Sequence, residues 1–368
     1  MIRVRSAALT VAVLVLTGCM SPPNTRGPAI DPDAAREEIS RSLPAGAQNR
    51  TGWAIDIFSA FEALSVPPTT EHICAVIAVA EQESNFQVDP QVPGLAAIAR
   101  REIDSRAASH KIPQFLVGAA LEVGSPNGMS YRERLEKART EKALSEIYED
   151  FINSVPLGGR LFADLNPVRT GGPMQVSIAF SERFAKEKKY PYPQPGNIRQ
   201  EVFTRRGGMY FGIAHLLAYP ASYDDMLFRF ADYNAGHYSS RNAAFQNAVS
   251  IVSKTSLVLD GDLLRFGSSA SEPSKTELAV RKVADRIDLS EGQIRNDLER
   301  GEDEAFERTK LYSRVFELAD KTRGKPVPRA MLPRIRLESP KITRKLTTEW
   351  FARRVDERYE RCLIRSRK

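Results

Sequence analysis

Three short segments, 83–86, 172–175 and 233–236, contain the residue types of this chain that are best suited to chemistry. The first offers the carboxyl group of Glu83, the second an amide beside a glycine turn, and the third a phenol followed by another amide. A single carboxyl group can act as a general acid when its pKa is raised towards neutral pH. Amide and phenol groups can hold a ligand rich in hydroxyl and acetamido groups beside it.

The first segment ends a predicted helix that starts at Thr69 and Thr70 and runs through 73–83. Residues 74–80 are apolar nearly all round, which predicts a helix buried in the centre of the domain. A carboxyl group at the point where such a helix meets a cleft is desolvated, so its pKa rises. Glu83 is therefore the candidate general acid, and Glu81, on another side of the helix, is interpreted as structural. Alternatively, both are the solvated end of a core helix.

The second and third segments are predicted turns. Residues 168–175 contain two adjacent glycines, which let a backbone approach a ligand closely, and Gln175 offers both a donor and an acceptor. In the third segment, Gly236 is the expected C-terminal cap of a helix that starts near Ser222. Tyr233 can place its ring against a sugar, and Asn234 can tie this turn back to the helix that ends at Glu83. The simpler interpretations are a plain loop and a plain helix stop with a core tyrosine.

Together and in this order, the three segments resemble the groove of the lytic transglycosylases, which have a lysozyme-like fold and cleave peptidoglycan glycan strands. The resemblance implies a mainly α fold, Glu83 as the catalytic acid and base, and no cofactor. It also implies five substrate-binding residues: Ser84, Met174, Gln175, Tyr233 and Asn234. The chain departs from the pattern at Pro173, which replaces leucine, and at Asp232, which replaces alanine. Phe351 stands where the closing helix of the family has a tyrosine directed at the catalytic glutamate.

Spacing predicts additions to a simple transglycosylase core. Glu83 and Gly172 are 89 positions apart (172 minus 83), so we expect a lysozyme-like core over 51–249 with a helical insertion at about 93–162. Within the insertion, 115–123 and 131–152 have helical patterns. A C-terminal helical extension over 250–368 is expected to return its last helix to the core. Residues 283–298 imitate a helix-turn-helix, but an exported chain does not meet the genome, so we expect no nucleic-acid partner.

The first residues predict export. Arg3 and Arg5 precede a short apolar run over 7–16, which is typical of a signal peptide covering 1–18. The run ends on a sequence similar to the bacterial lipobox, so Cys19 is expected to be acylated and to anchor the chain. A chance cysteine after an ordinary signal peptide is the alternative. Met20, in place of an aspartate, favours the outer membrane, and the proline-containing stretch 19–50 is expected to be a tether.

The charge and the cysteine content are also consistent with an envelope protein. The formal charge of +7 becomes +5 without Arg3 and Arg5, which suits anionic partners such as peptidoglycan stem peptides, or no specific partner at all. Besides Cys19 the chain has Cys74 and Cys362, an even pair that suggests one disulfide in an oxidising compartment. The four histidines show no metal-ligand spacing, so no metal site is expected. No serine-nucleophile elbow or phosphate-binding loop was found.

Over nearly its whole length the chain is similar to the YaiW lipoprotein family, which is defined by sequence. The segments that carry this similarity are 84–90, 92–95, 166–179, 205–208, 239–249 and 337–352. The resemblance implies an envelope lipoprotein with a lysozyme-like domain. Two functions remain open: a lytic transglycosylase, and a non-catalytic module that binds glycan or an envelope partner. A hydrolase with water held by Asp89 or Asp232 is a minor variant of the first.

Overall fold

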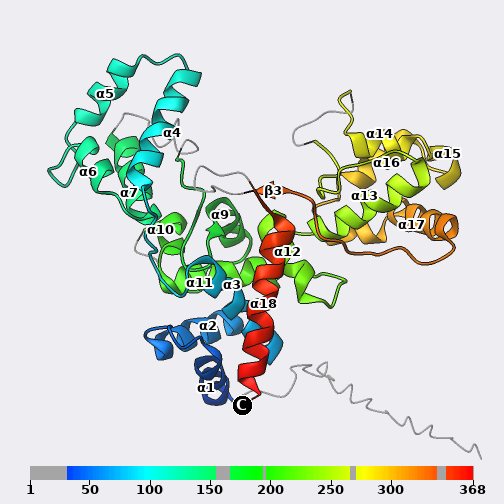
Figure 1. Cartoon of the computed structure of the whole chain (residues 1–368), viewed down its shortest axis with the longest axis horizontal. Helices are drawn as coiled ribbons and strands as arrows, with labels where there is room; N and C mark the ends of the chain where they lie inside the picture. Colours follow the sequence, from blue (N-terminus) through cyan, green and yellow to red (C-terminus); the bar gives the residue numbers. More distant parts are fainter. Residues whose placement is uncertain (1–30, 155–165, 194–195, 266–270, 338–344, 368) are drawn as a thin grey trace, which may run out of the picture.

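The computed structural model describes residues 31–154, 166–193, 196–265, 271–337 and 345–367. These residues form a mainly α-helical structure with two short antiparallel pairs. β1 (Thr170–Gly171) pairs with β2 (Val176–Ser177), and β3 (Arg336–Leu337) with β4 (Leu346–Thr347). Figure 1 shows a central helical body with a group of helices extending from each of two sides. No helix within the described ranges has both the length and the apolar composition needed to cross a membrane.

The central body surrounds α3, whose residues 73–80 are all buried. Its helices are α1 (Pro32–Ser42), α2 (Arg50–Leu64), α3 (Thr70–Glu83), α9 (Ile178–Glu187), α10 (Ile198–Val202), α11 (Arg205–Leu217), α12 (Met226–Ala235) and α18 (Thr348–Ser366). The small side chains of α3 let α18 lie directly beside it, as Figure 1 shows. Phe351, Val355 and Tyr359 of α18 join the same hydrophobic core. The last helix of the chain therefore packs against the helix that ends at Glu83.

The sequence predicted a tether over 19–50, but the hydrophobic core already includes residues of a helix that begins at Pro32. Asp31 caps α1, and Ala35, Ile39 and Leu43 are buried in the central core at four-residue spacing. Pro32 occupies the first turn of α1, where proline is tolerated because its missing N–H has no intrahelical partner there. Proline content alone suggested an extended chain, and the helical period of the apolar residues outweighs it. Residues 1–30, with the expected signal peptide and Cys19, lie outside the described residues.

The insertion forms its own small group of helices. They are α4 (Leu95–Ser109), α5 (Gln114–Glu122), α6 (Tyr131–Lys137) and α7 (Glu141–Ser154). The helix predicted over 131–152 is two helices, because the backbone becomes extended at Ala138 before α7 begins. Ser130 and Glu133 form a capping box that starts α6 directly after the glycine turn. The end of the expected insertion, 155–162, lies outside the described residues.

The C-terminal lobe has a hydrophobic core of its own. It contains α13 (Ser239–Ser253), α14 (Lys275–Arg281), α15 (Ala284–Ile287), α16 (Glu291–Leu298), the 3-10 helix η2 (Glu304–Arg308) and α17 (Lys310–Arg323). Phe245, Val249 and Val252 of α13 are buried in this second core, so α13 belongs to the lobe rather than to a core that ends at residue 249. The boundary lies near Tyr238, where φ is +65°.

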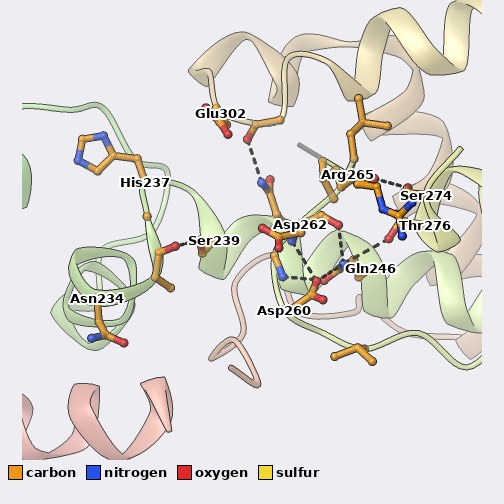
Figure 2. Close-up of a pocket in the computed structure, with 18 of the residues that line it drawn as sticks. Asn234, His237, Ser239, Gln246, Asp260, Asp262, Arg265, Ser274, Thr276 and Glu302 are labelled. Atoms are coloured by element: carbon orange, nitrogen blue, oxygen red, sulfur yellow. Dashed lines mark hydrogen bonds between the residues drawn. The ribbon is translucent and has the colours of Figure 1, made fainter. Parts of the chain in front are cut away.

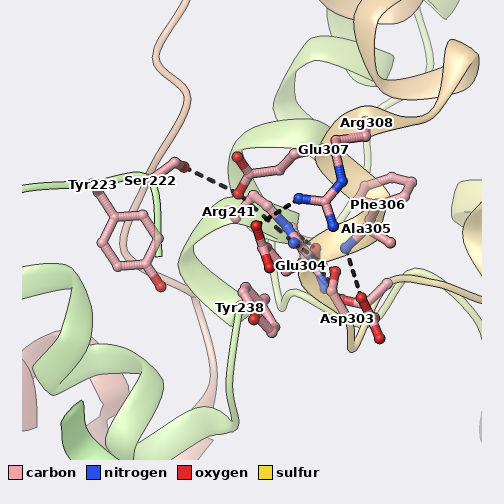
Figure 3. A network of polar contacts seen from close by, with 12 residues as sticks. Ser222, Tyr223, Tyr238, Arg241, Asp303, Glu304, Ala305, Phe306, Glu307 and Arg308 are labelled. Carbon is pink, nitrogen blue, oxygen red and sulfur yellow. Dashed lines mark hydrogen bonds and ion pairs between the residues drawn. The ribbon is translucent and has the colours of Figure 1, made fainter. Parts of the chain in front are cut away.

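Arg241, in the first turn of α13, belongs to a polar network of the C-terminal lobe that reaches the central body through Glu307 and Ser222. Its side chain is fully buried and donates hydrogen bonds to the backbone oxygens of Gly301 and Asp303. Its guanidinium also lies 3.7 Å from the Glu307 carboxylate, which accepts a 3.0 Å hydrogen bond from Ser222 of the central body. Figure 3 shows these groups converging from both parts of the chain. The network therefore fixes the lobe against the loop that precedes α12.

A disulfide links Cys74 of α3 to Cys362 of α18, across 288 positions of sequence. We expect the double substitution Cys74→Ala with Cys362→Ala to lower the free energy of unfolding by about 2–4 kcal/mol, because the bond restricts a very long loop in the unfolded chain. Urea denaturation of the oxidised protein and of the double variant measures this loss. Peptide mapping without reductant should recover the linked pair. Two free thiols in the native protein would contradict the bond.

Candidate functional site

A cleft with a volume of about 1540 Å³ lies between the central body and the C-terminal lobe. The central-body end is lined by Glu83, Gln175, Tyr233, Asn234 and Phe351. Amide, hydroxyl and carboxylate side chains line the lobe end, among them Gln246, Asp260, Asp262, Thr276 and Glu302. Figure 2 shows Asn234 and His237 on one side of this space and the Gln246 group on the other. Its volume and its polar lining suit a large ligand rich in hydrogen-bonding groups.

Glu83 is the last residue of α3 and opens onto this cleft. Desolvation raises the pKa of its carboxyl from the ordinary value to about 7, and the positive charge of Arg358 opposes the rise. Among the described residues, no hydrogen-bond partner of this carboxyl is found. A carboxyl group in this setting holds its proton at neutral pH and can release it, which is what a general acid needs.

The turn after Glu83 has an uncommon backbone conformation. Asn85 and Phe86 both have positive φ, +50° and +59°, in the left-handed region that bulky residues rarely occupy. The Phe86 ring is buried edge-on against Trp53, with the ring centroids 5.1 Å apart. Ser84 is also buried, and its hydroxyl donates to the Pro173 oxygen at 2.7 Å. Ser84 thus positions the second segment against α3 and does not line the cleft.

In the second segment only Gln175 reaches the cleft. Gly172 has φ +71°, and a Cβ there would come within 2.1 Å of the Val202 oxygen. The glycine is therefore needed for close packing inside the protein, whereas the sequence suggested close approach to a ligand. Met174 is completely buried, with its sulfur packed against Gly212. Gln175 adopts φ +50°, and its side-chain oxygen accepts a 3.0 Å hydrogen bond from Thr170.

In the third segment both Tyr233 and Asn234 line the cleft. The Tyr233 hydroxyl donates to the Met174 oxygen at 2.7 Å, which joins the second and third segments. Burial raises the pKa of Tyr233 well above its ordinary value, and the nearby Glu83 charge adds to the rise. Asn234 is exposed and accepts a 2.9 Å hydrogen bond from Thr348, so it ties the turn to α18 and not to α3. Gly236 caps α12 as expected.

Neither aspartate considered as a second carboxylate is found in the wall of the cleft. Asp232 is fully buried, and it accepts hydrogen bonds from the Tyr219 and Tyr223 hydroxyls and from backbone N–H groups of 238 and 240. Burial raises its pKa to about 7. Asp89 is exposed and lies outside the cleft lining. Among the described residues, Glu83 is thus the one carboxyl side chain that lines the central-body end of the cleft.

Phe351 lies in the cleft wall with Glu83 and is 5% exposed. Its ring gives the site an apolar face but no hydroxyl. Tyr359, further along α18, packs edge-on against Phe230 in the core. Among the described residues, no set of three or more histidine, cysteine, aspartate or glutamate side chains is arranged to bind a metal ion.

The sequence did not indicate a group of aromatic rings in the same wall. Phe180 of α9, His215 of α11 and His237, directly after α12, all line the cleft, and we call them the ring wall. The two histidine rings stack with centroids 4.5 Å apart. They are 22 positions apart on different elements, so no local spacing could have revealed the pair. The polar residues at the lobe end were missed for the same reason.

Comparison with known proteins places the chain in a family without a described activity. The family model for DUF1615, described as a protein of unknown function, matches residues 46–365. The chain is 55% identical to "Uncharacterized protein YaiW" of Escherichia coli (strain K12) over 362 residues, which cover 97% of this chain and 98% of that protein. No solved structure matches. The chain therefore belongs to the DUF1615 family, together with a YaiW protein to which it is similar over nearly its full length.

Proposed function

We propose that this protein cleaves peptidoglycan glycan strands as a lytic transglycosylase, between N-acetylmuramic acid and N-acetylglucosamine. The observation that carries the proposal is the carboxyl of Glu83 at the end of the buried helix α3, which lines a large polar cleft and whose pKa burial raises to about 7. Gln175, Tyr233 and Asn234 in the same wall support it. A lysozyme-like core, with α3 as its central helix, is part of the same proposal.

In the proposed reaction, Glu83 first donates its proton to the oxygen that links the two sugars. The bond from that oxygen to C1 of the muramyl ring breaks, and the departing sugar keeps the proton as a hydroxyl. The Glu83 carboxylate then takes the proton of the muramyl 6-hydroxyl while that oxygen bonds to C1. The product ends in a 1,6-anhydro ring, no water is consumed, and one carboxyl group serves for both steps.

Product analysis tests the proposal. The purified protein, kept in mild detergent, is incubated with purified peptidoglycan, and the released muropeptides are identified by mass spectrometry. Anhydromuramyl ends would support the transglycosylase, whereas reducing ends would identify a muramidase instead. If nothing is released and the folded protein still sediments with the sacculus, the cleft is a binding site and the catalytic proposal is wrong.

That last outcome corresponds to a second candidate function, a non-catalytic envelope module that binds glycan or a protein partner through the cleft. The observation that favours it is the lack of a hydrogen-bond partner for Glu83 among the described residues, with Phe351 in place of a tyrosine. A carboxyl tuned by burial alone is less well oriented than one held by a hydroxyl. The product analysis above separates the two functions.

We also propose that the protein is a lipoprotein of the outer membrane, anchored through Cys19. The support is the sequence of residues 1–20: a basic start, a short apolar run, and a lipobox-like ending with methionine after the cysteine. Labelling cells with a clickable palmitate analogue should mark the wild-type protein but not Cys19→Ala. Equal labelling of both forms would rule out this anchor.

The pH dependence of cleavage should follow Glu83. With its pKa at about 7, Glu83 is protonated below neutral pH and loses the proton that the first step needs above it. We expect the rate to fall by about tenfold per pH unit well above pH 7. Initial rates between pH 5 and 9 test this. Circular dichroism over the same range is the control, because Asp232 also titrates near pH 7 and could change the fold. A rate that rises through this range would contradict the role of Glu83.

A further inference from the structure

The ring wall is a row of ring contacts, stacked between His215 and His237 and tilted between Phe180 and His215. The ring centroids of Phe180 and His215 are 4.6 Å apart, and those of His215 and His237 are 4.5 Å apart. His237 in turn stacks on Tyr219, with the centroids 4.0 Å apart. Phe180, His215 and His237 are each partly exposed, and all three line the cleft beside the Glu83 end. These partly exposed rings give this part of the cleft an apolar surface. Such a surface suits the C–H face of a sugar ring.

The hydrogen bonds of the two histidines fix their protons. His215 Nε2 lies 3.2 Å from the backbone carbonyl oxygen of Tyr233, and His237 Nε2 lies 2.7 Å from the backbone carbonyl oxygen of His215. Carbonyl oxygens only accept, so each Nε2 carries the hydrogen. Burial lowers the pKa of His215 to about 3 and that of His237 to about 4, so both rings are neutral at pH 7. Each Nδ1 is therefore an acceptor.

The Nδ1 atom of His215 is buried and has no hydrogen-bond partner among the described residues, and the residue itself lines the cleft. A buried acceptor without a donor is costly, so this atom favours a ligand that brings an N–H or O–H group. An apolar ring surface together with an unused acceptor suits a sugar that presents both C–H groups and an amide N–H. N-acetylated hexosamines have this chemistry, and plain glucose units lack the N–H.

We propose that the ring wall is a subsite for an N-acetylated hexosamine next to Glu83, with Phe180 stacking on the sugar and His215 Nδ1 selecting the acetamido N–H. The inference rests on the proposed glycan function of the cleft and adds the residues that set its specificity. Such a subsite would hold the strand in register, so that one particular linkage lies at the Glu83 carboxyl.

Binding of uncharged oligosaccharides tests the subsite apart from catalysis. The Glu83→Gln protein serves as the parent, so that no ligand is consumed, and calorimetry compares chitotetraose with cellotetraose. We expect the parent to prefer chitotetraose, and Phe180→Ala to weaken chitotetraose binding about three- to tenfold through the loss of one aromatic contact. Phe184→Ala is the matched control, because Phe184 stacks on Phe180 from the same helix but lies outside the cleft lining. It should bind as the parent does.

His215→Phe keeps a ring in the wall and removes the acceptor. We expect it to lose the preference for chitotetraose, whereas a merely structural role would weaken both oligosaccharides equally. Failure of the subsite and failure of the proposed function are distinguishable. If wild type cleaves peptidoglycan but Phe180→Ala binds like the parent, the subsite is wrong and the function stands. If chitotetraose binding depends on Phe180 while wild type releases no muropeptides, the subsite stands without catalysis. No chitotetraose binding by the folded parent overturns the subsite.

Discussion

Glu83→Gln is expected to slow glycan cleavage by about 10²- to 10⁴-fold, the usual contribution of a general acid and base. Glutamine has the same shape but cannot donate the proton to the linking oxygen, so the first step loses its catalyst. Glycan affinity should remain, because Gln175, Tyr233 and Asn234 still line the cleft. The measurement is the initial rate of muropeptide release, compared with co-sedimentation of the same protein with the sacculus.

Glu81→Gln is the matched control for this prediction. Glu81 lies on the same helix two positions earlier, and its carboxylate is 3.5 Å from Arg361 and 3.8 Å from Arg358. It does not line the cleft, so the variant should keep most of the wild-type rate. Equal losses in both variants would point to damage at the end of α3. An unchanged rate in Glu83→Gln would remove the catalytic role from this residue.

The central helix could be predicted from the sequence because its signal is local. Caps at Thr69, unbroken apolar residues and a polar end all act within one stretch of chain, and the structure places α3 at the centre of the first core. The start of the core was misjudged for the opposite reason. Pro32 suggests an extended segment, and only the packing of Ile39 and Leu43 against other helices gives α1 its stability.

The candidate site was partly predicted, and the missing part depends on tertiary packing. Glu83, Gln175, Tyr233 and Asn234 line one cleft, whereas Ser84 and Met174 are buried and connect the segments. A motif does not tell which of its side chains face a ligand and which hold the loop in place. The ring wall comes from three elements, so its stacking exists only once α9, α11 and the end of α12 have packed.

Arg241→Met is expected to lower the free energy of unfolding by about 3–5 kcal/mol, the range for removing one partner of a buried ion pair. Methionine fills similar space but donates nothing. The backbone oxygens of Gly301 and Asp303 then lose their side-chain donor, and Glu307 loses its counter-charge. Burial already lowers the pKa of Arg241 from its ordinary value, and Glu307 opposes that shift most strongly among its neighbours.

The two tryptophans give this prediction a readout for each part of the chain. Trp53 and Trp350 both belong to the central body, so their fluorescence follows that part, while circular dichroism follows the helices of both parts. In urea, Arg241→Met should lose helical signal before the tryptophan transition, because the lost bonds join elements of the C-terminal lobe, which then unfolds first. Arg308→Met is the control: its ion pair with Glu304 is exposed, and such pairs add little to stability. Coincident, unshifted transitions in Arg241→Met would show that the lobe is held by its apolar contacts. The cleft lies between the two parts, so an unfolded lobe should also weaken glycan binding, and this loss connects the buried arginine to the function of the site.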